Sequence, residues 1–329
     1  MYAEQIVVAK EATNTSTSRI SHYAEEDVSY LLSAYTARNV RILLDRRMYT
    51  LKPELEDNWV WHAFRGFAMV ESRLAAIGRR PRSFAAIGTG SGVDAIGAAH
   101  IFGALRRLFV TDVEEPLVRL AAANIRANIR EEIKVEALPG DVCRPLIEAG
   151  AKLDVIYANL PNIPVTRGAD IIDHGTFYRP GADGTGDARL DKYLLWLQHH
   201  FLLSAKHALA PHGMALMMIG GRFPYQLFDR LASAAGFAFE EVLCYFKRQT
   251  EAENVLSGYA AAERDGIEFD FYDFDAARAT LRGGEQLDGR ALKEAIHPWR
   301  LSALDALQLM RRGKPIGHTL HFLKATPLG

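Results

Sequence analysis

A glycine-rich turn is the first feature of the sequence that could bind a ligand. The residues Gly88-Thr-Gly-Ser-Gly92 follow an apolar run, and small residues continue up to Ala99. Glycines let the backbone turn tightly and approach a ligand closely, and the first amide groups of a following helix face that ligand. The pattern predicts a strand, a binding turn and a helix. The turn also fits the dinucleotide pattern, so on its own it leaves NAD and other adenosine cofactors open.

Two acidic residues follow neighbouring β-rich runs at the point where each run ends. Asp112 closes the run from Leu108, about 20 residues after the glycine turn, and Asp141 follows the next run. A carboxylate in such a position can accept two hydrogen bonds from ribose hydroxyls, and a helix-capping role for Asp112 is the less favoured alternative. Because the carboxyl ends of parallel strands meet at one edge of a sheet, both acids are expected to face the same crevice.

A stiff polar turn follows the most informative run. The segment Asp154-Val-Ile-Tyr-Ala has the character of a buried strand, and Asn159-Leu-Pro-Asn162 comes directly after it. Proline fixes the backbone, so the Asn159 amide and the carbonyl after it can be held rigidly at the edge of the sheet.

The elements that must position these residues alternate along the chain. After residue 81, short β-rich runs closed by Gly or Asp are followed by helical segments, which is typical of a parallel sheet with crossover helices. The predicted strands are Ser83–Gly88, Arg107–Asp112, Lys134–Leu138, Asp154–Asn159, Met214–Gly220, Ala238–Tyr245 and His318–Lys324. The segment at about 248–317 is too long for a hairpin. Helical patterns at 276–282, 289–296 and 302–311 predict that it forms an inserted cap.

The first 80 residues have a different pattern. Residues 13–18 are all Asn, Ser or Thr, which predicts a mobile arm over residues 1–20. From residue 25 to about residue 78 apolar residues recur three and four apart, as at Val28, Leu31 and Leu32. We therefore expect an arm and helical lid over residues 1–80. Residues 81–329 should form the catalytic domain, with the cap inserted at about 248–317.

Composition limits the class of protein. The 329 residues are 49% hydrophobic and 24% charged, as in a globular chain with one large core. The net charge of -1 argues against nucleic acid and anionic membranes as partners. Cys143 and Cys244 lack metal-ligand spacing, so we predict no metal site. Because we find no signal-peptide pattern and no run of about 18 apolar residues, we expect a cytoplasmic protein.

Together these motifs resemble the class I S-adenosylmethionine-dependent methyltransferases, and within them the release-factor glutamine N-methyltransferase (HemK-like) group. The resemblance covers about residues 83–242, including the glycine turn, both strand-end acids and the segment 176–187. The turn of that group is Asn-Pro-Pro-Tyr. Here Asn159 and Pro161 match it, whereas Leu160 and Asn162 do not. The missing aromatic residue favours a small acceptor over a glutamine or a nucleobase.

The resemblance implies a Rossmann-like, seven-stranded sheet that binds S-adenosylmethionine. The cofactor-binding residues that it implies are Gly88, Thr89, Gly90, Gly92, Asp112, Asp141, Val142 and Asn159. The glycines would lie near the methionine moiety, Asp112 on the ribose, and Asp141 with Val142 at the adenine. Catalytic roles are implied for Asn159, Pro161 and Tyr178. Side chains expected to line the substrate or form the lid are Tyr23, Tyr30, Tyr35, Asn162 and Phe177. The aromatic rings among them could lie against the sulfonium.

Methyl transfer to a small-molecule acceptor with an amine or amide nitrogen is the expected function. The sulfonium supplies an activated carbon, so positioning and exclusion of water should dominate catalysis. A cyclase that forms azetidine-2-carboxylate and releases methylthioadenosine is the alternative, since the altered turn and a large cap would suit a closed site. An NAD-dependent oxidoreductase is less favoured, because that function would leave Asp141 and the Asn159 turn without a role. A binding protein without turnover is least favoured, and the oligomeric state stays open.

Overall fold

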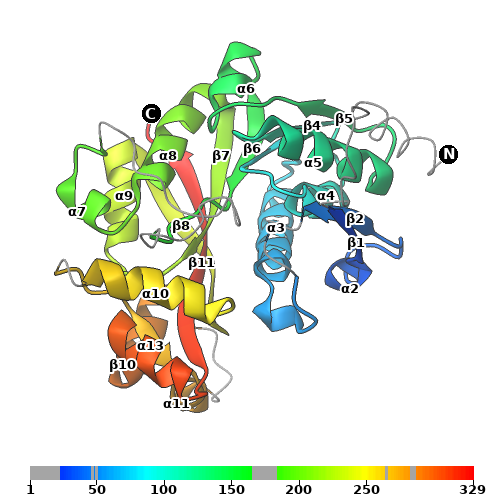
Figure 1. Cartoon of the computed structure of the whole chain (residues 1–329). Coiled ribbons are helices and arrows are strands. Elements are labelled where there is room, and N and C mark those ends of the chain that lie inside the picture. The colour runs from blue at the N-terminus through cyan, green and yellow to red at the C-terminus, as the bar shows by residue number, and fades with distance from the viewer. Residues whose placement is uncertain (1–22, 46–47, 49–50, 165–183, 264–265, 282–286) are drawn as a thin grey trace, which may run out of the picture.

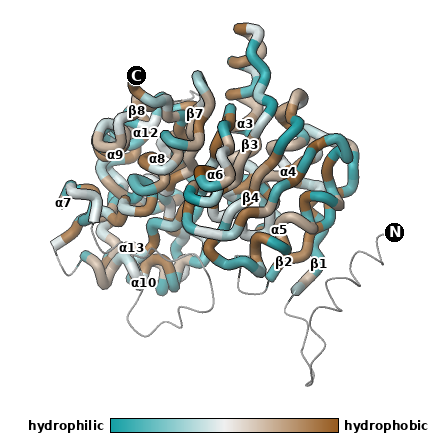
Figure 2. The backbone as a smooth tube through the Cα atoms, turned by 90° about the horizontal axis from the view of Figure 1, so that it is seen from above, coloured by the Kyte–Doolittle hydropathy of each residue, from teal (hydrophilic) through white to brown (hydrophobic). Residues whose placement is uncertain are grey.

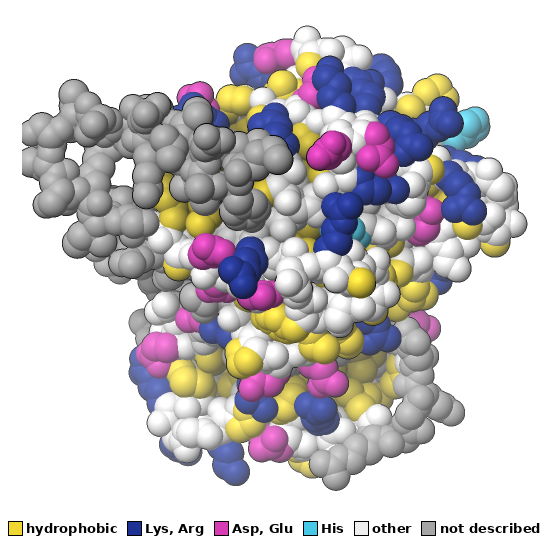
Figure 3. Space-filling view, turned by 90° about the vertical axis from the view of Figure 1, so that its right-hand side faces the viewer, with side chains coloured by type: hydrophobic (Ala, Val, Ile, Leu, Met, Phe, Trp, Pro, Cys, Tyr) yellow, Lys and Arg dark blue, Asp and Glu magenta, His cyan; other side chains and the backbone are white. Residues whose placement is uncertain are grey.

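The described part of the chain combines one large sheet with helices on both of its faces. This computed structural model describes residues 23–45, 48, 51–164, 184–263, 266–281 and 287–329. A small two-stranded sheet lies beside the large one (Figure 1). Among the described helices, none is both long and apolar enough to cross a membrane. Basic and acidic side chains are interspersed on the face seen in Figure 3.

The large sheet is parallel at its centre and antiparallel at one side. The strands in the order β7-β6-β3-β4-β5 run parallel, and the last strand, β11, lies antiparallel between β7 and β8. These strands are β3 (Ser83–Ile87), β4 (Arg107–Thr111), β5 (Lys134–Ala137), β6 (Leu153–Ala158), β7 (Leu209–Gly220), β8 (Phe237–Arg248) and β11 (Ile316–Pro327). Each overlaps one of the seven predicted strands, so the predicted Rossmann-like fold is confirmed. Two short strands that the sequence did not indicate, β9 (Phe271–Asp273) and β10 (Arg300–Leu301), extend the sheet.

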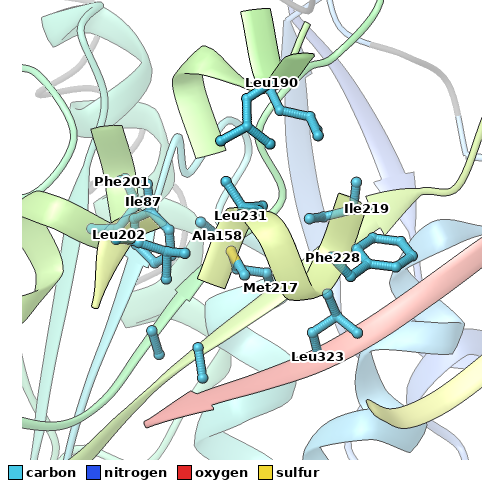
Figure 4. Packing of buried hydrophobic residues seen from close by; sticks show 14 of the residues in the cluster. Ile87, Ala158, Leu190, Phe201, Leu202, Met217, Ile219, Phe228, Leu231 and Leu323 are labelled. Carbon is cyan, nitrogen blue, oxygen red and sulfur yellow. The ribbon is translucent and has the colours of Figure 1, made fainter. Parts of the chain in front are cut away.

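Side chains of the central strands alternate between two apolar layers. Phe84 and Ala86 of β3 belong to the layer under α3 (Trp59–Ala76), α4 (Val93–Ile101) and α5 (Glu115–Asn128). Ala85 and Ile87 belong to the layer under α8 (Trp196–Ala208) and α9 (Leu227–Ala235) (Figure 2). Figure 4 shows residues of the second layer from α8, α9 and the sheet. Strands buried on both faces explain the nearly continuous apolar runs of the sequence.

Helix α3 forms part of one apolar layer of the core, together with α4 and α5. Phe64 and Phe67 are fully buried, and the Phe67 ring centroid lies 4.8 Å from that of Tyr157 in β6. A helix packed in this way cannot open as a lid without exposing much of the core. The division of the chain into residues 1–80 and 81–329 stays a prediction.

Residues 23–45 differ from the helical prediction. They form β1 (Tyr23–Asp27) and β2 (Arg41–Asp45), which pair antiparallel, with only the single-turn helix α2 (Ser29–Leu32) between them. Side chains of α5 hydrogen-bond to β2: Asn124 Oδ1 accepts from the Leu43 amide at 2.9 Å, and Asn128 Oδ1 accepts from the Arg41 amide at 3.1 Å. Because these partners are more than 80 residues away in the chain, local spacing could not indicate the strand.

Within its described residues, the insertion before β11 contains the three expected α-helices and one more. They are α11 (Phe274–Thr280), α12 (Gly289–Ile296) and α13 (Ala303–Arg311), at the predicted places. The additional helix, α10 (Ala252–Glu263), packs against α13. Gly258 in its middle weakens the local helix signal. A Cβ there would lie 2.5 Å from the Pro164 carbonyl oxygen, so glycine allows the Asn159 turn segment to lie against α10.

A buried ionic group holds the insertion together. Asp270 accepts a hydrogen bond from Lys293 Nζ at 2.7 Å and another from Arg300 Nε at 2.6 Å. The Lys293 and Asp270 side chains are only 9% and 10% exposed, so neither charge is well solvated. Each therefore depends on its partner to offset the cost of leaving water.

Replacing Asp270 with alanine should destabilise the protein. The change leaves Lys293 buried without its counter-ion, which typically costs about 3–5 kcal/mol of unfolding free energy. Chemical denaturation of the wild type and the variant measures this difference. Glu253→Ala is the control: it removes the exposed ion pair with Arg311 and should leave the free energy of unfolding nearly unchanged. Equal effects of the two substitutions would contradict this role for Asp270.

Candidate functional site

The carboxyl ends of β3, β4 and β6 open into one cavity with a volume of about 660 Å³. This volume is within the range of small-molecule sites, about 300–1,000 Å³. Of the predicted cofactor residues, the cavity lining includes Gly88, Thr89, Gly90, Asp112, Asp141, Val142 and Asn159. Gly92 lies behind this wall, where a Cβ would be 3.0 Å from the Ala121 carbonyl oxygen. Because Gly92 has no side chain, the start of α4 can pack closely against α5.

The glycine turn presents backbone to the cavity. Gly88 and Gly90 have φ angles of +62° and +50°, a region that other residues rarely adopt. The turn then enters α4, whose first amide groups have no partner within the helix. These conformations and this helix start make a surface for a polar or anionic part of a ligand.

Asp112 fixes the turn from the neighbouring strand. Its Oδ2 accepts a hydrogen bond from the Gly90 amide at 3.2 Å, and its Oδ1 accepts one from the Glu114 amide at 3.2 Å. Each carboxylate oxygen has a second lone pair, so ribose hydroxyls could still donate to it. Burial raises the pKa of Asp112, partly offset by these amide hydrogen bonds. Further donors from a ligand would stabilise the ionised form.

The third strand end contributes Asp141 and Val142. His200 Nε2 lies 3.2 Å from Asp141 Oδ2, and the His200 ring is stacked on Trp196, which also lines the cavity. Val142 has a φ of +36°, held in part because the Thr111 hydroxyl donates to its carbonyl oxygen at 2.9 Å. Backbone strain in a β-branched residue is costly and is concentrated at binding sites.

The Asn159 turn is held from three sides. Gln198 Nε2 donates to the Leu160 carbonyl oxygen at 2.9 Å, the Tyr259 hydroxyl donates to the Asn162 carbonyl oxygen at 2.7 Å, and Asn162 Nδ2 donates to the Gly220 carbonyl oxygen at 3.2 Å. The Asn162 side chain lines the cavity but is used to attach the turn to β7. Asn159 and Pro161 also line the cavity, so the predicted rigidity has a physical cause.

The predicted tyrosines from the N-terminal region lie elsewhere. Within the described residues, the cavity lining contains none of Tyr23, Tyr30 and Tyr35. Tyr23 is exposed in β1, Tyr35 packs edge-on against Phe64, and the Tyr30 hydroxyl donates to the Lys52 carbonyl oxygen. A direct contact of these rings with the sulfonium is therefore not supported. Phe177 and Tyr178 lie outside the described residues.

Two cavity residues that the sequence analysis missed are Trp59 and Asp94. Asp94 is the second residue of α4, and its Oδ1 is buried with no hydrogen-bond partner in the described structure. Burial raises its pKa from 3.8 to about 7, although a hydrogen bond with Trp59 acts in the opposite direction. An acid within the otherwise apolar segment 93–99 is the signal that could have indicated it. A carboxylate with this pKa can accept a proton near neutral pH.

The wall formed by β7, β8 and β11 has a different character. Arg222, Lys247 and His318 line the cavity there, together with Gln249, the first residue after β8. All four residues are buried. We call these four residues the basic wall.

A second polar cluster lies outside this cavity. The atoms of Glu241, Cys244 and His321 that could ligate a metal ion lie within 4.8 Å of one another. Glu241 Oε1 lies 2.6 Å from His321 Nδ1, while Thr319 Oγ1 lies 2.8 Å from the other ring nitrogen. The cluster's hydrogen-bonding groups are thus already paired within the protein. They connect β8 to β11 through side chains.

The segment that matches a known family is the one that carries the glycine turn and the strand-end residues. Residues 67–173 match the family model for ribosomal protein L11 methyltransferase (PrmA). The match begins within α3 and includes the glycine turn, Asp112, Asp141 and the Asn159 turn. It supports the predicted class, an enzyme of the class I S-adenosylmethionine-dependent methyltransferases. It gives no support to the glutamine N-methyltransferase subgroup.

Individual relatives match less of the chain or match it distantly. A ribosomal protein L11 methyltransferase from Staphylococcus saprophyticus is 40% identical over 74 residues, which are 22% of this chain and 22% of that protein. A putative sarcosine dimethylglycine methyltransferase from Galdieria sulphuraria has a TM-score of 0.40 and 12% identity, with 87% of this chain and 94% of that chain covered. A putative RNA methyltransferase from Pyrococcus horikoshii has a TM-score of 0.41 and 12% identity, with 84% and 89% covered.

Replacing Asp112 with alanine should weaken binding of S-adenosylmethionine. The change removes a charged acceptor at the predicted ribose position and the hydrogen bonds that fix Gly90 and Glu114, so the dissociation constant should rise about 10- to 100-fold. Titration calorimetry measures it. Glu115→Ala, which removes an exposed acid at the start of α5, is the control and should bind like the wild type. Unchanged affinity in the Asp112 variant would place the ribose elsewhere.

Replacing Asp94 with asparagine should change how stability depends on pH. Between pH of about 4 and about 7 the unfolded chain ionises Asp94 while the folded chain does not, so wild-type stability decreases over this interval and the loss persists above it. The variant lacks this loss and should gain a few kcal/mol relative to the wild type between pH 5 and pH 8. Denaturant titrations of the ligand-free proteins at both pH values measure the gain. Parallel pH profiles would contradict the raised pKa.

Proposed function

We propose that this chain is an S-adenosylmethionine-dependent methyltransferase that acts on the nitrogen of a small molecule. The observation that carries the proposal is that the glycine turn, Asp112 and Asn159 line one cavity within the segment that matches a methyltransferase family model. Because the curated relative is matched over only a fifth of its length, the activity of the whole chain is our proposal.

Each group has a part in this reaction. S-adenosylmethionine, when bound, supplies an electrophilic methyl carbon on a sulfonium. The glycine turn and Asp112 hold the nucleoside and methionine parts, and Asp141 with Val142 forms the adenine end. The Asn159 side-chain oxygen accepts a hydrogen bond from the acceptor nitrogen and directs its lone pair toward the methyl group. Asp94 accepts the proton that the nitrogen loses.

One hydrogen bond within the Asn159 turn supports a small-molecule acceptor. In the glutamine N-methyltransferase group the carbonyl after Asn takes part in substrate binding, whereas here the Leu160 carbonyl accepts a hydrogen bond from Gln198. A protein acceptor, as named for the relatives, is the other possibility that the assay below must include. The two buried free cysteines are consistent with a reducing compartment, and we propose a cytoplasmic location.

A second candidate is the cyclase. It is favoured by the Leu160 carbonyl, which already accepts a hydrogen bond from Gln198, and by the buried Asp94. In that reaction the amine of S-adenosylmethionine attacks its own γ-carbon, the bond from that carbon to sulfur breaks, and methylthioadenosine leaves. The ammonium group must lose one proton before its nitrogen can attack, and Asp94 is again the acceptor beside the cavity.

Product analysis tests the proposal. We expect S-adenosylhomocysteine only when an acceptor is added from a panel of small amines, amides and purified ribosomal protein L11, as detected by mass spectrometry. In Asn159→Ala, kcat should fall roughly 10- to 100-fold while affinity for S-adenosylmethionine stays nearly the same, because the lost hydrogen bond serves the transition state. Asn254→Ala, an exposed asparagine in α10, is the control. Methylthioadenosine from S-adenosylmethionine alone, lost in Asn159→Ala, would contradict methyl transfer and favour the cyclase.

A further inference from the structure

The basic wall holds two buried cations that the proposed chemistry has not used. Arg222 and Lys247 are each only 6% exposed, and both line the cavity. Among the described residues, no ion pair joins either of them to a carboxylate: Arg222 donates to Gln249 Oε1, and Lys247 Nζ donates to the Arg248 carbonyl oxygen at 3.0 Å. Removing a cation from water without a counter-ion is costly, so the position calls for an anion.

The neighbours of Arg222 leave one side of its guanidinium available. Nε and Nη2 donate to Gln249 Oε1 at 3.0 and 2.7 Å, and Nη2 also lies 3.3 Å from His318 Nε2. Among the described residues, no carboxylate lies within hydrogen-bond distance of Nη1, although the Tyr259 hydroxyl group interacts with the guanidinium. A Cβ on Gly220 would lie 2.1 Å from Nη1, so this nitrogen occupies the space that a side chain at the end of β7 would fill. Gly220 itself lines the cavity.

The other charges near the wall neutralise it only in part. His318 Nδ1 lies 2.9 Å from the Thr319 carbonyl oxygen, which places the proton on Nδ1 and leaves Nε2 to accept from Arg222. Burial also lowers the pKa of His318, so this ring is neutral. Glu251 is 2.7 Å from Lys52 and is thus paired with another cation. Burial lowers the pKa of Lys247 to about 8, while the charge of Asp57 raises it in part.

The basic wall is connected to the Asn159 turn. The Arg222 guanidinium carbon lies 5.5 Å above the centroid of the Tyr259 ring, and the Tyr259 hydroxyl holds the Asn162 carbonyl. Gly220, which Arg222 contacts, accepts the hydrogen bond of the Asn162 side chain. An anion bound at Arg222 would therefore be fixed relative to the group that directs the nucleophile.

We propose that Arg222 and Lys247 bind a carboxylate belonging to the molecule whose amine is the nucleophile. Two donors, Nη1 and the Lys247 ammonium, suit the two oxygens of one carboxylate, whereas a phosphate would bring a third oxygen and more charge. This inference rests on the proposed function. The carboxylate has two sources: a separate amino-acid acceptor in methyl transfer, or the methionine part of S-adenosylmethionine in the cyclase.

Binding measurements with matched ligands test the inference and its two sources. The first arm compares S-adenosylmethionine with decarboxylated S-adenosylmethionine by titration calorimetry. The second arm saturates the protein with S-adenosylhomocysteine and compares amino acids with their amides. We expect the carboxylate to improve affinity about 10- to 100-fold in one of the two arms. The preference should be largely lost in Arg222→Gln and reduced in Lys247→Gln.

Controls separate this inference from the function on which it rests. Arg311→Gln removes an exposed cation of the same kind and should keep the preference for the carboxylate. Methylthioadenosine, which lacks the carboxylate, should bind the wild type and both cavity variants equally. Absence of its binding would contradict the proposed cofactor. Normal binding of methylthioadenosine with no carboxylate preference in either arm, or a preference kept in both variants, would overturn this inference alone. If Arg222→Gln does not fold, Lys247→Gln decides.

Discussion

The carboxylate of Asp112 joins two strand ends and the glycine turn through backbone amides. One oxygen holds Gly90 and the other holds Glu114, so the turn after β3 and the start of the segment after β4 keep a fixed relation. The Asp112 carbonyl also accepts a hydrogen bond from the Gly140 amide at 2.9 Å, which extends the connection toward the end of β5. The geometry of the cofactor side of the cavity depends on this residue, because positive-φ glycines have little conformational preference of their own.

On the opposite side of the cavity, hydrogen bonds from side chains, rather than from backbone amides, hold the Asn159 turn in place. The Asn159 turn is held by Gln198 from α8 and Tyr259 from α10, two helices that both follow it in the sequence and are separated by β7, α9 and β8. Fixed polar groups reduce the reorganisation needed when charge changes at the reacting atoms. The side formed by the glycine turn and the separately supported Asn159 turn therefore meet at the ends of β3 and β6.

The sequence allowed the sheet and its ligand edge to be predicted, because strands buried on both faces give apolar runs and their ends carry Asp112, Asp141 and Asn159. It did not allow β1 and β2 to be predicted, since β2 is held by asparagines of α5 that are distant in the chain, and β1 in turn pairs with β2. Trp59, Asp94 and Arg222 were missed for a related reason. A lone acid or cation gains chemical meaning only when folding buries it against a cavity, and this burial depends on contacts between distant segments.

The insertion between β8 and β11 contributes Gln249, Thr250, Glu251 and Val255 to the cavity, while the cofactor side comes from residues before 143. These two parts of the site are thus encoded by separate stretches of the chain, with the Asn159 turn and Arg222 between them in the sequence. Mutations that lengthen, shorten or recompose the insertion could alter which molecule reacts without disturbing the nucleotide pocket. In evolutionary terms, this fold can acquire a new substrate through one local change in its coding sequence.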